Sequence, residues 1–313
     1  MTTRAALVSL IFLTCIAGCV STAPDRARTD GDVARVASPP ESDAAGEASQ
    51  QLVSYYARVQ RSLVAQGLLR TDSQAADAPY TSTHLTENFL RIALFEEYSV
   101  VSGRPIASVT ESKLHRFAEP VQVSLEFQGT IPDVVSQRDR RTVSEYVTRL
   151  ARASGHPMRM VPKDGNFQVI VADEPSRRAL GPRLTELIPA MDPGTLGTVL
   201  NLPRSFYCIV IGYDPQDDGT YTQAVAIIRA ELPDLMRASC FHEEIAQGLG
   251  LSNDSPAARP SVFNDDEEFA LLTLHDEHLL RILYDQRLRP GMEAADATPI
   301  ARTIAEELAA GPS

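Results

Sequence analysis

The middle of the chain alternates between two hydrophobic spacings, and this order limits the possible folds more than any other feature of the sequence. Apolar residues alternate with polar ones at 121–127 and again at 167–171, as in half-buried strands, and residues 143–151 between them have helical spacing. The continuous apolar run at 206–211 predicts a central strand buried on both faces, and residues 221–228 predict another. We therefore expect an α/β (α+β) fold, with a mixed, twisted sheet backed by helices.

The N-terminus carries a short export signal. Arg4 precedes an apolar run at 5–13, which is too short to span a bilayer, and small residues then lead to Cys19. The sequence Ile16-Ala17-Gly18-Cys19 resembles the lipobox of bacterial lipoproteins, which implies cleavage before Cys19 and acylation of that residue. Val20, rather than Asp, follows Cys19, so the resemblance implies anchoring in the outer membrane on its periplasmic face. The alternative is an ordinary secretory signal with an incidental cysteine.

Beyond the signal, the chain divides into a tether and a folded body. Residues 20–48 are rich in Ala, Ser, Pro, Asp, Arg and Gly and have no helical or strand period, which indicates a flexible tether. Helical spacing returns after this segment. The expected segments are a lipoprotein signal peptide at 1–18, a lipid-anchored tether at 19–48, an N-terminal helix and loop at 49–83, the main domain at 84–292, and a C-terminal helix and tail at 293–313.

Charge and cysteine content narrow the range of partners. The formal net charge is −12, so no electrostatic attraction favours nucleic acid, and no such partner is expected. Export leads to an oxidising compartment, where Cys208 and Cys240 remain beside the anchoring cysteine. An even pair of cysteines in that setting favours a disulfide over two free thiols.

The most informative stretch reads Glu-Glu-Ile-Ala-Gln-Gly-Leu-Gly-Leu-Ser-Asn-Asp and begins at Glu243. Glu243 and Gln247 are four residues apart, so they share one face of a helix. Gly250 permits a left-handed turn that can return Asn253 to the same place. Glu244, one position after Glu243, can reach a water held there. This arrangement suits metal-assisted hydrolysis.

The same stretch resembles the active-site helix of metzincin-type zinc peptidases. Their H-E-x-x-H-x-x-G-x-x-H motif matches the spacing of Glu243, Gln247, Gly250 and Asn253, with Glu244 at the position of the general base. The resemblance implies a zincin-like fold with an active-site-type helix and a C-terminal helix. It also implies Glu244 as the catalytic residue and Glu243, Gln247 and Asn253 as metal ligands.

Two later features extend this resemblance. Residues 261–263 stand where metzincins have a methionine turn, with Phe263 in place of the methionine. Thr273 and Asp276 fit the capped start of a last helix. More closely, residues 88–292 resemble a proteobacterial lipoprotein family of unknown function, whose signature ends here at Asp254 and which supplies a fold expectation but no activity.

The differences from the metzincin pattern determine which of the family's metal-binding properties can be expected of this chain. All three ligand histidines are replaced, by Glu243, Gln247 and Asn253. Zinc prefers His and Cys ligands, whereas this oxygen set would hold a hard divalent cation weakly. We therefore expect no cofactor. Instead, Gln247 and Asn253 are expected to donate hydrogen bonds to the carboxylates of Glu243 and Glu244.

Other polar residues near this motif have plainer interpretations. His242 precedes the first glutamate as in a zincin motif, but we interpret it as structural because Ala246 occupies the second histidine position. His275 and His278 share one helix face and are either late metal ligands or, as we favour, a solvated or capping pair. The run at 264–268 is either a cation loop or, as we favour, a solvated acidic loop.

These observations are compatible with three alternative functions. The favoured one is a binding module that holds a periplasmic polypeptide or cell-wall component, with residues 221–228 pairing with an extended ligand as a strand does. The second is an atypical metal-dependent hydrolase with Glu244 as general base. The third is an inert structural lipoprotein of the envelope.

Overall fold

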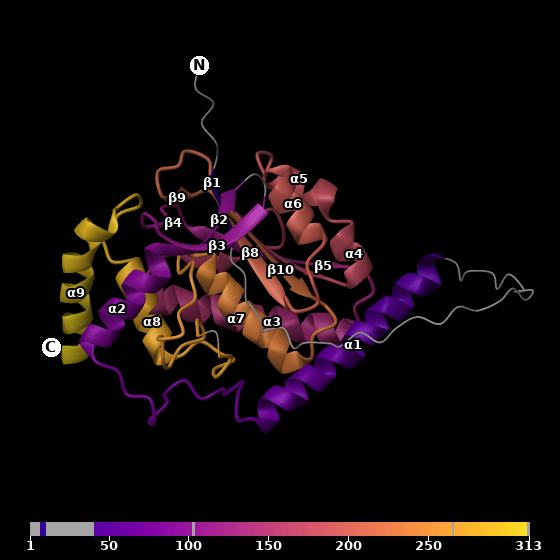
Figure 1. The fold of residues 1–313 in the computed structure, drawn as a ribbon, viewed down its shortest axis with the longest axis horizontal. Coiled ribbons are helices and arrows are strands. Elements are labelled where there is room, and N and C mark those ends of the chain that lie inside the picture. The colour runs from indigo at the N-terminus through magenta and orange to yellow at the C-terminus, as the bar shows by residue number, and fades with distance from the viewer. Residues whose placement is uncertain (1–6, 11–40, 102–103, 265, 312–313) are drawn as a thin grey trace, which may run out of the picture.

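A mixed sheet forms the centre of the protein (Figure 1), which the computed structural model describes at residues 7–10, 41–101, 104–264 and 266–311. The strand order is β8 (Cys208–Asp214), β10 (Gln223–Arg229), β7 (Phe167–Ala172), β5 (Val121–Gln128) and β6 (Met158–Met160). β10 runs antiparallel to β8 and parallel to β7, and β7, β5 and β6 are mutually parallel. The expected mixed sheet backed by helices is confirmed. β1 (Leu7–Leu10), inside the expected signal segment, pairs antiparallel with β8 at the edge.

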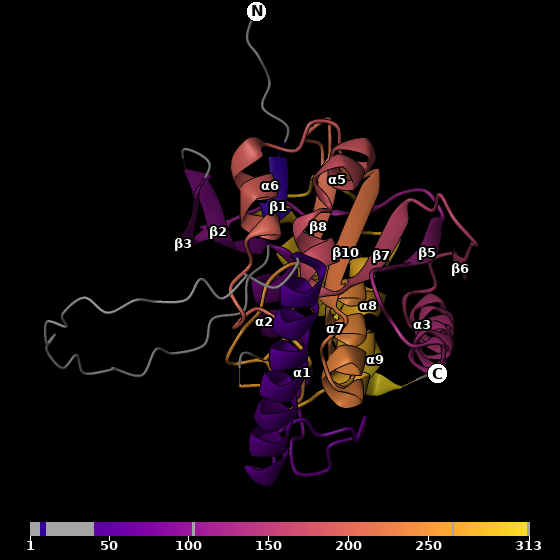
Figure 2. The same ribbon diagram turned by 90° about the vertical axis from the view of Figure 1, so that its right-hand side faces the viewer.

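Helices cover both faces of this sheet (Figure 2). α3 (Asp133–Ser154), α7 (Asp234–Gln247) and α8 (Leu274–Leu283) pack on one face, where Ala224, Ala226 and Ile228 of β10 are buried. On the other face, Val225 and Ile227 pack beneath three short helices, which are α4 (Glu174–Arg178), α5 (Gly181–Leu187) and α6 (Pro193–Leu200). Because alternate side chains of β10 enter two cores, its sequence is apolar from Ala224 to Ile228.

The remaining elements surround these layers. α1 (Glu41–Ala65) is a long helix that contacts α4, and α2 (Ser82–Ala93) packs against α8 and α9 (Ala294–Ala310). β2 (Phe95–Val101) and β3 (Arg104–Glu111) form a hairpin, and β4 (Arg116–Phe117) pairs with β9 (Thr220–Tyr221). In the described part of the chain, no helix combines the length and apolar character needed to cross a membrane.

The structure corrects three expectations about these elements. The tether was expected to extend to residue 48, but α1 begins at Glu41, where alanine and glutamate favour a helix. The sequence at 175–188 predicts one helix, whereas the structure has two short ones there, α4 and α5. Residues 221–228 were expected to accept a ligand strand, yet β10 is hydrogen-bonded along both edges, to β7 and β8. This strand therefore has no free edge for a ligand to pair with.

Residues 1–6, 11–40 and 312–313, which include Cys19 and most of the expected signal and tether, lie outside the described residues, so the predictions for them stay predictions.

Candidate functional site

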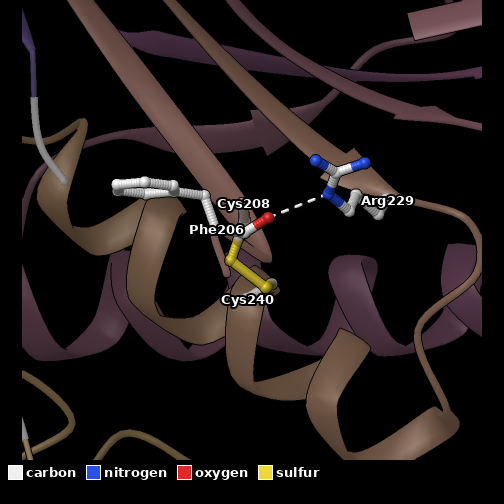
Figure 3. Close-up of a disulfide and its surroundings, with 4 residues drawn as sticks. All are labelled: Phe206, Cys208, Arg229 and Cys240. Atoms are coloured by element: carbon white, nitrogen blue, oxygen red, sulfur yellow. Dashed lines mark hydrogen bonds between the residues drawn. A yellow bond between two sulfur atoms is a disulfide. The ribbon is translucent and has the colours of Figure 1, made fainter. Parts of the chain in front are cut away.

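A disulfide attaches the helix that carries the signature to the central sheet (Figure 3). Cys208, the first residue of β8, is bonded to Cys240 of α7, with 5.9 Å between their Cα atoms. Arg229 of β10 adds a second tie, because its Nε donates a 2.8 Å hydrogen bond to the carbonyl oxygen of Phe206 just before β8. The expected disulfide is confirmed, and it holds the turn before Glu243 against the sheet.

Most signature side chains on α7 are buried, and Glu243 is half-buried. Only 5% of Glu244 is exposed, and its Oε2 has no hydrogen-bond partner among the described residues. Burial, reinforced by the nearby carboxylate of Asp254, raises the pKa of Glu244 well above its usual value. Gln247 is 1% exposed, and its Nε2 donates a 2.9 Å hydrogen bond to Oδ1 of Asp254. Gln247 was expected to donate to Glu243 or Glu244, so the expected acceptor is wrong.

A glycine turn then directs the chain toward α2. Gly250 has a φ of +121°, and a Cβ there would lie 2.0 Å from the carbonyl oxygen of His115, so only glycine fits. After this turn, the backbone N–H of Asn253 donates to the carbonyl oxygen of Ile92 at 3.0 Å, and its Nδ2 donates to that of Arg91 at 2.9 Å. The left-handed turn expected at Gly250 is confirmed, but it returns Asn253 to the end of α2.

Asp276 joins the later features of the motif into one hydrogen-bonded cluster. Its carboxylate accepts hydrogen bonds from the Ser261 hydroxyl at 2.5 Å and the Val262 amide at 3.0 Å. It also accepts from the amide and hydroxyl of Thr273, which caps α8 in a capping box with Asp276. Phe263, in the methionine-turn position, is buried in the core. The expected helix cap is confirmed, and Asp276 also fixes the 261–263 turn.

The residues present do not fit the zinc centre that the metzincin resemblance implies. Among the described His, Cys, Asp and Glu side chains, the group with metal-ligand spacing is Cys208, Glu243 and Glu244, whose ligand atoms lie within 4.8 Å of one another. Cys208 is held in the disulfide and offers no thiolate. The amides of Gln247 and Asn253 are engaged in the hydrogen bonds described above. No step of chemistry is therefore assigned to a metal here.

Two cavities adjoin the signature from different sides. Glu243 lines a cavity of about 20 Å³ together with Asn264, Glu267 and Phe269, which is space for about one water molecule. Burial raises the pKa of Glu267 to about 7, so this end of the 264–268 run packs against the protein rather than forming the expected solvated loop.

On the other side, Asn253 and Asp254 line a cavity of about 480 Å³ with residues of α2 and its C-terminal end. The lining is mainly apolar, and its full set is Glu87, Leu90, Arg91, Phe95, Asn253, Asp254, Ser255 and Pro256. Since Glu243 and Asn253 line different cavities, the signature faces two separate places. The spacing of Phe89, Ile92, Ala93 and Phe95 predicts a helix, and α2 covers the first three, while Phe95 begins β2. Nothing in the sequence indicated that α2 would form a wall of the site.

A comparison with known protein families shows the family to which this chain belongs. The profile of a family described as a protein of unknown function (DUF2927) matches residues 82–303. The chain belongs to this family. The DUF2927 match begins at α2 and ends within α9, so both walls of the 480 Å³ cavity lie inside it and α1 lies outside. Neither the search of curated proteins nor the search of solved structures finds a match.

Three histidines of this DUF2927 domain, His242, His275 and His278, have structural partners. His275 is fully buried, 3.0 Å from Asn88 Nδ2, and Nδ1 of His278 lies 3.0 Å from the Tyr80 hydroxyl. The two were expected to be solvated or capping residues, and His275 is neither solvated nor an end cap. His242 stacks on Tyr146 at 3.9 Å between ring centroids, and its Nδ1 accepts a 3.0 Å hydrogen bond from the Leu272 amide.

Burial of His242 predicts acid sensitivity. Burial lowers its pKa to about 3, whereas the unfolded chain titrates near 6.5. The unfolded state therefore binds the extra proton as pH falls below about 6.5, and stability is lost from there down toward pH 3. At pH 5, this single group costs about 2 kcal/mol relative to pH 7.5.

Urea unfolding at both pH values measures this cost. His242→Gln keeps a hydrogen-bond acceptor but does not titrate, so its loss of stability between pH 7.5 and pH 5 should be smaller by about that amount. Other titrating groups act equally on both proteins. An identical loss in the variant would contradict a neutral, buried His242.

Proposed function

We propose that this protein is a lipoprotein of the outer membrane, anchored through Cys19 on the periplasmic face, whose folded domain binds a polypeptide without metal chemistry. The motif at 243–254 supports a binding role because its polar side chains bond to other parts of the fold and line one wall of the 480 Å³ cavity. Gln247 donates a hydrogen bond to the carboxylate of Asp254, and Asn253 donates one to a carbonyl oxygen of α2. This is the organisation of a rigid binding surface rather than of a set of converging ligands.

The observation that carries the proposal is the unpaired oxygen of Asn253 at the wall of the 480 Å³ cavity. Asn253 is 5% exposed, and its Oδ1 has no hydrogen-bond partner among the described residues. A buried acceptor without a partner is costly, and an N–H group of a ligand would remove that cost. Peptide backbones supply such donors at regular spacing.

The remaining lining suits an apolar side chain of the same ligand. Leu90, Phe95 and Pro256 supply apolar surface, and Asp254 and Ser255 supply polar groups beside it. Mostly apolar cavities of roughly 300–1,000 Å³ with a few placed polar groups are typical of ligand sites. Recognition by a pocket also replaces the strand pairing that the closed edges of β10 rule out.

An array of immobilised random hexapeptides tests this proposal. We expect the protein to select hexapeptides with a large apolar residue. Pro256→Glu should weaken binding of the best of them at least tenfold, because it places a charge at the apolar wall. Pro256 is exposed, so the fold should be retained.

Ala257→Glu is the matched control, because Ala257 is the next exposed residue and is not part of this cavity lining. Its affinity should match that of the unsubstituted protein. Absence of selection, equal weakening by both variants, or cleavage of the selected hexapeptide would contradict a binding module at this cavity.

A further inference from the structure

A third cavity, beside α1 and α4, is lined by several arginines. Its volume is about 830 Å³, and it lies between α1 and a wall made by α4, β10 and the segment that follows α6. α1 and α4 pack against each other there (Figure 1). The charged residues of its lining are Arg58, Arg178, Arg204, Arg229 and Glu174.

The single carboxylate of this lining is already shared by three arginines. Glu174 accepts hydrogen bonds from Arg178, from Arg229 and from Arg177, which lies behind the cavity wall. Arg177 and Arg229 are 0% and 2% exposed, so two of these guanidinium groups are buried. A second buried carboxylate, that of Glu231, lies behind this wall and accepts a 2.6 Å hydrogen bond from the Glu174 amide. Two carboxylates do not balance three guanidinium groups, and the wall keeps an excess of positive charge.

Two further arginines add to that excess. Within the described residues, neither Arg58 nor Arg204 has a carboxylate at salt-bridge distance, and both are exposed. The Arg204 guanidinium lies over the Tyr55 ring, 4.8 Å from its centroid, which limits its orientation. Both arginines line the same cavity, so their charges add to that of the buried guanidinium groups.

We propose that this cavity binds the phosphate group of an anionic ligand. Guanidinium groups from α1, α4 and the segment after α6 surround the space from several sides, which suits a tetrahedral oxyanion better than a planar carboxylate. Gln50, Gln51 and Ser54 of α1 line the same space and supply neutral hydrogen-bond donors. The phosphate belongs either to a soluble molecule or to a lipid headgroup. This site is independent of the polypeptide cavity proposed above.

Calorimetric titration of the purified protein with inorganic phosphate tests the chemistry, with acetate as the planar comparison at equal ionic strength. We expect phosphate to bind, and the double variant Arg58→Gln/Arg204→Gln to bind it at least tenfold more weakly. Both arginines are exposed, so unchanged thermal unfolding should show that the variant folds. Arg302→Gln, which removes an exposed arginine from α9, should leave the affinity unchanged.

Sedimentation with vesicles distinguishes the two sources of phosphate. Binding to phosphatidylglycerol vesicles but not to phosphatidylcholine vesicles, lost in the double variant, would assign the site to a lipid headgroup. Because the protein is acidic overall, such binding would occur against its net charge. Binding of inorganic phosphate without vesicle binding would assign it to a soluble ligand. Binding of neither probe, equal binding of acetate, or equal binding by the double variant would overturn the proposal.

Discussion

Replacing Asp276 by alanine is expected to lower the free energy of unfolding by about 3–5 kcal/mol. The carboxylate is fully buried and accepts hydrogen bonds from Ser261, Val262 and Thr273. Without it, several buried donors lose their partner, and each such loss costs roughly 1–3 kcal/mol before relaxation. The same substitution removes the capping box at the start of α8 and the link to the 261–263 turn.

Urea unfolding monitored by circular dichroism measures this effect. Asp296→Ala is the matched control, because Asp296 is an exposed aspartate in the first turn of α9. Its loss should stay below about 1 kcal/mol, the usual size of a charge effect at a helix end. A loss of similar size in the two variants would mean that Asp276 does not organise the turn and the last helices.

Removing the disulfide should have the second large effect. Cys208 and Cys240 are separated by 32 positions in the sequence, and a loop of that length predicts about 3–4 kcal/mol of stabilisation through the unfolded state. Cys208→Ser/Cys240→Ser should therefore unfold at a clearly lower urea concentration. A reducing agent should shift the unsubstituted protein by the same amount and leave the double variant unchanged. Equal midpoints with and without reducing agent would contradict a stabilising bond.

Local structure in this domain could be predicted where the hydrophobic pattern is strict. The alternation at 121–127 predicted β5, and the spacing at 143–151 predicted part of α3. Residues 167–171 were predicted as a half-buried strand; they lie in β7, but every residue of this strand is buried, including Ile170 at a position where alternation would place a polar residue. The pattern does not specify neighbours, however. Residues 221–228 were predicted as one strand; the structure divides them between the end of β9 and β10, and the place of β10 between two other strands depends on the whole sheet.

The candidate site shows the same division between local and long-range information. Helical spacing placed Gln247 near the C-terminal end of its helix, and the glycine at 250 predicted the turn that follows. The partners of those residues come from distant segments and could not be predicted. Asn253 bonds to a carbonyl of α2 some 160 positions earlier, and Gln247 prefers Asp254 to the adjacent glutamates. Because of these hydrogen bonds, the two residues form part of a buried polar network and not the metal site that their spacing suggested.

The charged cavity beside α1 also could not be predicted from the sequence. Arg177 and Arg229 are 52 positions apart, and nothing in their local sequence indicates that both contact Glu174. The two arginines reach the same carboxylate because the folded layers place α4 near the end of β10.

The central claim is that the signature shapes a binding cavity that works without a metal. It is tested most directly by measuring the affinity of the best hexapeptide before and after dialysis against a chelator, with elemental analysis of the same samples. We predict one affinity in both states, whatever metal the untreated sample contains, and at least tenfold weaker binding in Pro256→Glu. Affinity that disappears with the chelator and returns with a stoichiometric divalent cation would contradict this account.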